Sequence, residues 1–121
     1  MSESKPESND CLFCKIIAGE IPSNKVYEDA DVFAFHDINP ASPTHILIIP
    51  KKHLTSIASA EEADQALLGK LMLTANAIAK EQGLNPQGFR YVINTGEFGG
   101  QTVFHLHLHL LGGRSLTWPP G

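Results

Sequence analysis

The segment that decides the fold reads Val103-Phe104-His105-Leu106-His107-Leu108-His109-Leu110-Leu111. Side chains alternate between the faces of a β-strand, so it predicts a strand with one apolar face and one histidine face. The three imidazoles would stand about 6.8 Å apart. Imidazole is costly to bury without a partner and serves near neutral pH as nucleophile, acid, base or metal ligand. A merely exposed strand would more often carry Thr, Lys or Glu, so the pattern indicates a chemical site. The apolar face would carry Phe104, Leu106, Leu108 and Leu110.

Length and composition predict one compact domain. The 121 residues are 42% hydrophobic, which is enough to bury a core. Nine basic and thirteen acidic residues give a net charge of −4, which argues against binding a nucleic-acid polymer or an anionic membrane through bulk charge. Residues 1–10 are polar and predict a disordered tail, and residues 11–121 predict the single domain. With no signal peptide or membrane-spanning segment visible, we expect a cytoplasmic protein.

Turn residues divide the domain into short elements. Helical spacing predicts a short helix over 11–18, and strand patterns predict strands over 25–28, 32–37, 44–49, 89–94 and 103–111. The capping pattern Ser59-Ala60-Glu61-Glu62 and an apolar stripe predict one long helix that ends at Gly83. The expected fold class is α+β, with a mainly antiparallel five-stranded sheet that is half covered by helix.

A glycine-rich loop enters the histidine segment directly and reads Thr95-Gly96-Glu97-Phe98-Gly99-Gly100-Gln101-Thr102. Glycine lets backbone N–H groups approach an anion closely, and Gln101 and Thr102 would add side-chain donors. The loop therefore predicts an oxyanion or phosphate subsite beside the imidazoles. The alternative is that it is only a turn, as most glycine pairs are.

A second candidate subsite lies on the predicted strand 32–37. Alternation places Phe33, Phe35 and Asp37 on one face. The rings could pack on a base while the carboxylate accepts hydrogen bonds from a ribose diol. The alternative for Asp37 is a loop-capping role before Asn39, and the sequence alone favours neither.

Cys11 and Cys14 have a spacing typical of metal or redox chemistry in reduced proteins. Tetrahedral zinc needs two further ligands, and His53 and His105 are the available candidates for a closed structural site. The alternative is that both cysteines are buried as small apolar side chains. A redox pair is less favoured, because the two residues between the thiols carry no charge that would activate them.

The histidine segment resembles the alternating signature of the histidine triad superfamily, and its nearer match is to the Hint branch of nucleotide-binding proteins. The resemblance covers nearly all of the chain from Cys11 to Gly121. The other supporting strings are Phe13 with Lys15-Ile16-Ile17, Phe35-His36-Asp37-Ile38, Pro43-Thr44-His45, Ile49-Pro50-Lys51-Lys52-His53, Gly99-Gly100-Gln101-Thr102, Gly112-Gly113-Arg114 and Trp118-Pro119-Pro120-Gly121.

The resemblance implies a HIT-like fold and a homodimer whose sheet continues across the two subunits. It implies a purine nucleoside phosphoramidase that cleaves the P–N bond of adenosine or guanosine 5′-phosphoramidates. His107 would attack the α-phosphorus and form a nucleotidyl-histidine that water then hydrolyses. The resemblance also implies phosphate contacts by His109, Asn94, Gly100 and Thr102, support of the nucleophile by His45, ribose binding by Asp37, and base contacts by Phe13, Ile16, Phe35 and Ile38.

Two features refine what the resemblance implies. Thr102 stands where the animal proteins commonly have Ser, which keeps a hydroxyl but could change protonation of the leaving group. Cys11 and Cys14 match the zinc-bearing bacterial-type members, so structural zinc is implied. No cluster of acidic residues adjoins the histidine segment, so we expect no catalytic metal or other catalytic cofactor.

Two other functions stay open. One is a dinucleoside polyphosphate hydrolase or nucleotidyl transferase of the same superfamily, and the extension 112–121 argues against the hydrolase. The other is a non-catalytic regulatory module that binds a nucleotide or a metal through its histidines. Trp118 and the two prolines after it predict a stiff tail that packs on another surface. The resemblance implies that this surface is the partner subunit near the leaving group, and the alternative is the tail's own subunit.

Overall fold

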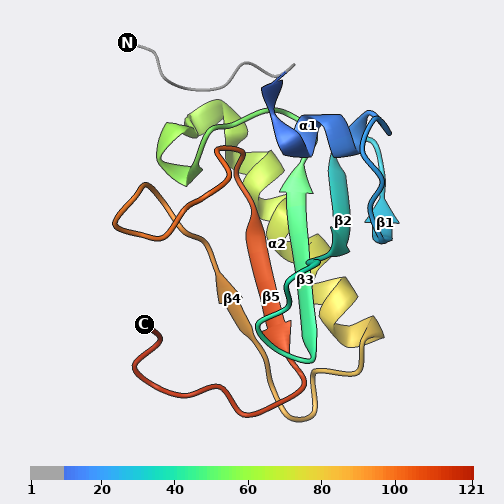
Figure 1. The fold of residues 1–121 in the computed structure, drawn as a ribbon, viewed down its shortest axis with the longest axis vertical. Helices are drawn as coiled ribbons and strands as arrows, with labels where there is room; N and C mark the ends of the chain where they lie inside the picture. Colours follow the sequence, from blue (N-terminus) through green and yellow to red (C-terminus); the bar gives the residue numbers. More distant parts are fainter. Residues whose placement is uncertain (1–9) are drawn as a thin grey trace.

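The computed structural model describes residues 10–121, so the predicted N-terminal tail lies outside the described residues apart from Asp10. The fold is α+β, as predicted (Figure 1). No helix within residues 10–121 is long and apolar enough to cross a membrane. The elements in chain order are α1 (Leu12–Ile17), β1 (Lys25–Glu28), β2 (Val32–His36), β3 (Thr44–Pro50), the 3-10 turns η2 (Ile57–Ser59) and η3 (Glu62–Asp64), α2 (Gln65–Glu81), β4 (Arg90–Val92) and β5 (Leu108–Gly112).

The five strands form one antiparallel sheet with the order β1-β2-β3-β5-β4. The long helix α2 lies behind this sheet, and α1 lies at its upper end (Figure 1). Alternate residues of β2 and β3 therefore enter two different cores. The core on the α2 side includes Val32, Ala34, Ile46, Ile48, Leu108 and Leu110, and the core under α1 includes Phe13, Ile16, Phe33, Phe35, Leu47 and Ile49.

The strand β5 is shorter than the sequence predicted, because it begins at Leu108 rather than at residue 103. Its ladder with β3 starts at the pair Ile48 and Leu108. Two residues further along β3, the same register would place Pro50 opposite Leu106. Pro50 still pairs with Val32 of β2, but proline has no N–H to donate toward Leu106, so the ladder with β5 stops before that pair. The preceding chain instead turns toward residue 54, whose carbonyl oxygen accepts a 2.6 Å hydrogen bond from the Leu106 N–H.

The predicted faces of this segment are only partly confirmed. Leu106, Leu108 and Leu110 are buried in the α2 core as predicted. Phe104 is 41% exposed, so its predicted place in that core is wrong. Residues 105 and 107 lie before the strand, which frees their side chains from regular strand spacing.

The long helix begins later than the capping pattern at Ser59 predicted. Ser59 and Ser56 cap each other around η2, where the Ser56 Oγ accepts from the Ala58 N–H at 3.1 Å. Asp64 holds the next turn by accepting from the Glu61 N–H at 2.9 Å, and α2 starts only after it. The predicted end is confirmed, because Gly83 has a φ of 75° and terminates the helix in the left-handed conformation that glycine tolerates.

Candidate active site

A cavity of about 450 Å³ opens on the sheet face that α1 only partly covers. Its wall is mainly apolar toward α1 and β2, apart from His36, and includes His107 and His109 on the β5 side. A groove of about 630 Å³ along α2 is larger, but it is lined by no histidine or cysteine. The cavity residues used below are Phe13, Ile16, Phe35, Asp37, Ile38, Leu47, Thr102, His107 and His109.

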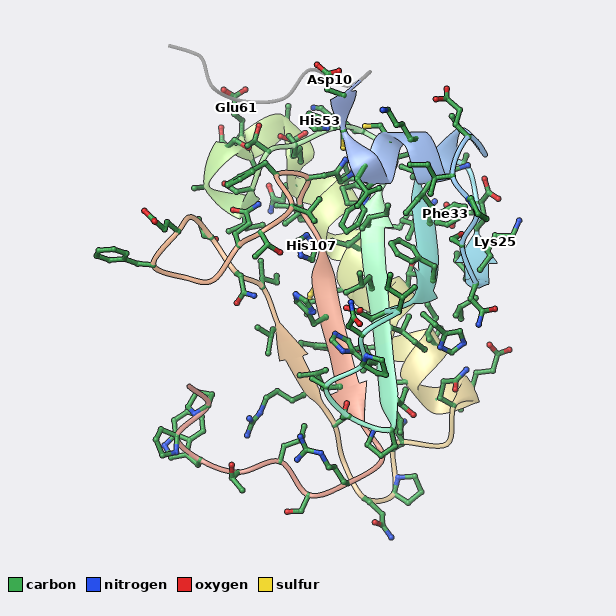
Figure 2. All side chains as sticks on the ribbon, viewed as in Figure 1. Asp10, Lys25, Phe33, His53, Glu61 and His107 are labelled. Atoms are coloured by element: carbon green, nitrogen blue, oxygen red, sulfur yellow. The ribbon has the colours of Figure 1, made fainter. Side chains whose placement is uncertain are left out.

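His107 lies just before the first residue of β5 (Figure 2). One of its ring nitrogens is hydrogen-bonded to the main chain. Its Nδ1 lies 2.7 Å from the carbonyl oxygen of His105. A carbonyl can only accept, so Nδ1 carries the proton and donates it, and Nε2 keeps its lone pair. Burial lowers the pKa of His107, and the lone pair is therefore available at neutral pH.

His45 and His109 form a second, directed pair. The Ala41 N–H donates to the His45 Nδ1 at 2.9 Å, so neutral His45 carries its proton on Nε2. That Nε2–H donates to the His109 Nδ1 at 2.9 Å, which leaves the proton of His109 on its own Nε2. The pKa of His109 is lowered to about 4, chiefly by burial and further by the neighbouring His107 and His45. The pair thus presents a neutral N–H donor.

The Nε2 atom of His109 is buried and has no hydrogen-bond partner among the described residues. A buried donor without a partner is unusual and points to a ligand atom that accepts from it. His45 contacts His109 rather than His107, so the support that the resemblance implied for the nucleophile falls on its neighbour. The direct support of His107 comes from the carbonyl of His105, a main-chain group that residue types do not reveal.

Asp37 has a different partner on each carboxylate oxygen. Its Oδ1 accepts from the Asn39 N–H at 2.8 Å, which is the loop-capping role considered for it. Its Oδ2 lies 3.5 Å from the His45 Nε2, and the residue lines the cavity. The loop cap therefore leaves the second oxygen facing the site, so the two interpretations of Asp37 are compatible.

The glycine-rich loop is built differently from the prediction. Gln101 is buried, and its Oε1 accepts from the Gly96 N–H at 2.9 Å. Its Nε2 donates to the carbonyls of Thr55 and Val103 at 2.7 and 3.1 Å. The expected free side-chain donor at Gln101 is therefore wrong, because the amide is consumed in holding the loop.

The main-chain donors of the loop are also occupied. The Gly99, Gly100 and Gln101 N–H groups donate to carbonyls within the loop at 3.0 to 3.2 Å. Thr102 follows them and reaches the cavity wall. Asn94 and Gly100 lie side by side, since a Cβ on the glycine would be 3.9 Å from the Asn94 Nδ2, but neither lines the cavity. Their phosphate contacts stay a prediction.

Cys11, Cys14, His53 and His105 meet in one cluster, as the sequence predicted, with Cys11 and His105 buried and Cys14 and His53 partly buried. The Cys11 Sγ and the His53 Nδ1 each lie 3.2 Å from the His105 Nδ1. The Cys14 Sγ lies 3.4 Å from the His53 Nδ1 and 3.5 Å from the His105 Nδ1. Tetrahedral zinc with Zn–S and Zn–N bonds of about 2.3 and 2.0 Å needs ligand separations of about 3.3 to 3.8 Å, close to these values.

The protonation pattern of the cluster also fits a metal. The His105 Nε2 donates to the Pro50 carbonyl at 2.8 Å, so its Nδ1 presents a lone pair to the cluster. This second hydrogen bond is the usual way in which a metal-binding histidine is oriented. Burial raises the pKa of the Cys14 thiol to about 12, with further increases from Cys11, so a cation is needed to hold the thiolate. These contacts favour the interpretation of Cys11 and Cys14 as metal ligands over the alternative that they are buried only as small apolar side chains.

Asp37, His45 and His109 form a second group of possible ligands. It does not fit a cation in the same way, because a neutral imidazole has only one lone pair. The lone pair of His45 already accepts from the Ala41 N–H, and its Nε2 carries the proton. A metal at that Nε2 would have to displace the hydrogen bond that holds the ring.

The fold and the site together define an α+β protein with a cavity that contains His107 and His109. Comparison with known protein families identifies the family. The family model described as HIT domain matches residues 18–116. The chain belongs to the HIT domain family.

Relatives and solved structures place the chain within that family. A 14 kDa zinc-binding protein of Zea mays is 54% identical over 95% of this chain and 91% of its own length. A protein of Arabidopsis thaliana named Adenylylsulfatase HINT1 is 51% identical over 96% of this chain and 80% of its own length. The crystal structure of a HIT family hydrolase from Legionella pneumophila superimposes with a TM-score of 0.91 at 52% identity, over 92% of this chain and 99% of that one. The predicted Hint branch is confirmed, and the chain is a HIT-type hydrolase.

Proposed function

We propose that this protein hydrolyses purine nucleoside 5′-phosphoramidates by forming a nucleotidyl intermediate on His107. The observation that carries the proposal is the fixed pair of tautomers at the cavity. His107 offers an Nε2 lone pair because its Nδ1–H is held by the carbonyl of His105. His109 offers an N–H donor because His45 holds its other nitrogen. A nucleophile beside a neutral donor is what displacement at phosphorus requires.

The reaction divides into two displacements. In the first, the His107 Nε2 attacks the α-phosphorus, the P–N bond breaks, and the amine leaves with the bonding electrons and takes up a proton from solvent. Thr102 and His109 line the cavity. The hydroxyl of Thr102 and the N–H of His109 would donate hydrogen bonds to the reacting phosphate and to its leaving group. In the second, water attacks phosphorus, the bond to His107 breaks, and the released proton leaves with the products. The carbonyl of His105 stabilises the positive ring that exists between the two steps.

The cavity wall supports a purine nucleoside as the common part of the substrate. Phe13, Ile16, Phe35 and Leu47 form an apolar surface on which a base would stack. Asp37 lines the same cavity, and its Oδ2 lies 3.5 Å from the His45 Nε2, so a ribose hydroxyl would donate to this carboxylate. Ile38 is 88% exposed at the rim and would cover one edge of the base.

A second candidate substrate is a nucleoside 5′-phosphosulfate. The observation that favours it is the 51% identity to the protein named Adenylylsulfatase HINT1. The nucleophile and the intermediate would be the same, and sulfate would leave in place of an amine. Because sulfate is a weakly basic leaving group, this substrate would depend less on proton donation than a phosphoramidate.

Intact-protein mass spectrometry after brief mixing with adenosine 5′-phosphoramidate tests the proposal. We expect an added adenylyl group on the wild-type chain and none on His107→Ala. Adenosine 5′-phosphosulfate and a dinucleoside polyphosphate, tested in parallel, rank the leaving groups. Nucleotide binding without an adduct or turnover on any of the three would contradict the enzyme and favour a binding module.

We also propose that the cysteine and histidine cluster binds one zinc ion that stabilises the fold. The support is the ligand geometry described above and the relatives named as zinc-binding proteins. The ion would supply no chemistry to the reaction and would tie α1 to the segment before β5. Free thiols at Cys11 and Cys14 also favour a reducing compartment, for which we propose the cytoplasm.

We propose further that two copies pair through the β4 side of the molecule, so that the sheet continues across a homodimer. The strand β4 is at one edge of the sheet, where its outer main-chain groups have no neighbouring strand. Ile93 and Met72 are 36% and 37% exposed, and Trp118 is 80% exposed. A dimer that covers this edge would bury apolar surface that one subunit leaves in water.

A further inference from the structure

One residue belongs to both the metal-ligand cluster and the active site. The ring of His105 contacts the Cys11 Sγ and the His53 Nδ1 at 3.2 Å. The carbonyl oxygen of the same residue accepts the 2.7 Å hydrogen bond that sets the tautomer of His107. A change in the position of the His105 ring is therefore transmitted to the nucleophile through the backbone of a single residue.

The position of His105 is determined from several sides. Its ring is fully buried and donates to the Pro50 carbonyl at 2.8 Å. The next residue, Leu106, donates its N–H to the carbonyl of residue 54 at 2.6 Å. The peptide group between residues 105 and 106 carries the carbonyl that His107 uses. It is thus held by the cluster on one side and by one main-chain bond on the other.

Helix α1 makes a second connection between the same two sites. Its N-cap is the ligand Cys11, whose Sγ accepts from the Cys14 N–H at 3.3 Å. Two residues further on, the Phe13 ring packs edge-on against His107, with centroids 5.1 Å apart and an interplanar angle of 87°. Phe13 also contacts the His105 ring at 5.9 Å. A cluster that holds α1 in place therefore also holds an aromatic wall against the nucleophile.

We propose that metal occupancy of the Cys11, Cys14, His53 and His105 cluster controls the reactivity of His107. With the metal bound, His105 acts as a positioning residue whose carbonyl keeps the Nδ1–H tautomer, and Phe13 limits rotation of the ring. Loss of the metal frees the His105 ring and the start of α1, so His107 samples other orientations. The enzyme is then responsive to chelators and to reagents that modify the two thiols.

The kinetic part of the test rests on the proposed function. Wild-type protein is compared with metal, after removal of metal by a chelator, and as the Cys14→Ser variant. The control is Ala79→Gly in α2, which is buried on the opposite side of the sheet and lowers stability without touching either site. For each protein we would measure the rate of adenylyl transfer to His107, the Kd for AMP, and the NMR signal of the His107 Nδ1–H proton.

We expect the chelator-treated protein and Cys14→Ser to form the adduct at least tenfold more slowly, with the Kd for AMP changed less than threefold. The Nδ1–H signal should broaden or disappear in both, and added zinc should restore the wild-type chain only. Ala79→Gly should keep the signal and a rate within twofold of wild type at temperatures where it is folded. Cadmium-loaded wild-type protein, which carries a larger ion, should stay folded and react at least threefold more slowly.

An unchanged rate and an unchanged Nδ1–H signal after metal removal would overturn the proposal and leave the cluster with a structural role alone. Should the metal-free protein unfold, equal rates and signals in the zinc and cadmium forms would overturn it instead. If wild-type protein shows no adduct at all, the proposed function fails, and the proton signal with and without metal still decides whether the two sites are coupled.

Discussion

Main-chain groups decide which nitrogen of each active-site histidine carries a proton. The carbonyl of Pro50 orients His105, the carbonyl of His105 orients His107, and the N–H of Ala41 orients His45 and, through it, His109. Neutral imidazoles offer one donor and one acceptor, so each of these bonds leaves the other nitrogen with a defined role. The site thus has its hydrogen-bond directions in place before any nucleotide arrives.

Removing the nucleophile is the most direct test at this scale. We expect His107→Ala to abolish turnover while the Kd for AMP stays within about tenfold of wild type, because the change deletes the attacking atom and few ground-state contacts. Stopped-time assays and calorimetric titration measure the two quantities. Turnover near the wild-type rate would rule out a covalent step at this residue.

The lowered pKa of His109 predicts how stability depends on pH. Its pKa is about 4 in the folded chain, against an ordinary value of 6.5, chiefly because of burial. Between these values the unfolded chain binds the proton more readily, so the stabilisation from neutral His109 is present above pH 6.5 and is lost as the pH falls toward 4. Urea unfolding at several pH values should show this loss, and His109→Gln should reduce it. If the free energy of unfolding depended on pH equally in the wild type and in His109→Gln, the prediction would be contradicted.

Residue types revealed which side chains carry the chemistry but not how they pair. The types and spacing of the cysteines and histidines predicted the metal-ligand cluster, because zinc needs those ligands, whereas the role of His107 as nucleophile came only from the family resemblance and stays a prediction. Alternation could not show that His45 contacts His109, since it gives faces and no distances. Nor could it show that the Gln101 amide is consumed inside its loop, because that depends on main-chain groups of Gly96 and Thr55.

Among the elements, the loop before β5 depends on a single buried amide. Gln101 makes three hydrogen bonds that join its two ends and connect it to residue 55. Gln101→Leu would leave the part-buried N–H of Gly96 and the carbonyls of Thr55 and Val103 without these hydrogen bonds. We therefore expect a loss of stability of about 1 to 3 kcal/mol and slower turnover. Urea denaturation and steady-state kinetics check this, with Glu97→Ala on the exposed part of the same loop as control. A change no larger than that of the control would contradict it.

The short helix α1 is too small to be stable by itself and depends on the cluster at its start. Loss of a ligand in His53→Ala should lower Tm by several degrees, corresponding to about 1 to 3 kcal/mol for a domain of this size. Elemental analysis of purified protein and thermal melts with and without added zinc provide the measurement. Protein that contains no zinc and melts at the same temperature when zinc is added would exclude a zinc site.

The ends of the individual strands were predictable to different degrees for a physical reason. Apolar runs bounded by turn residues and proline placed β2 and β3 nearly to the residue, because both faces of these strands are buried. Alternation overestimated β5, because the ladder depends on whether the facing residue can donate, and Pro50 cannot. The periodicity of the β5 segment cannot reveal that a residue of the neighbouring strand, Pro50, lacks an N–H.

On the scale of the whole molecule, the C-terminal extension is attached at only a few points. Arg114 donates to the carbonyl of Ala41 at 2.9 Å, and Arg90 donates to that of Thr117 at 2.8 Å. Beyond these contacts Trp118 is 80% exposed, which is unfavourable for a lone indole. The exposure agrees with the proposed packing of this tail on a partner subunit and not with packing on its own.

Deleting residues 116–121 should change the preference among leaving groups more than the affinity for AMP. The physical reason is that the tail, in the proposed dimer, would reach the amine side of the substrate and not the base. Values of kcat/KM for several adenosine phosphoramidates that differ only in the amine give the test. An equal fractional change for all of them would remove any role of the tail in selecting substrates.

The bond from the Ala41 N–H to His45 also affects how sequence variation at this position would be tolerated. The Ala41 side chain is exposed, so most replacements would meet no steric barrier, and all of them except proline would keep the N–H. A survey of substitutions would therefore score position 41 as permissive, although the proton on His109 depends on it. Ala41→Pro alone would remove the donor, and the tautomers of His45 and His109 would no longer be fixed.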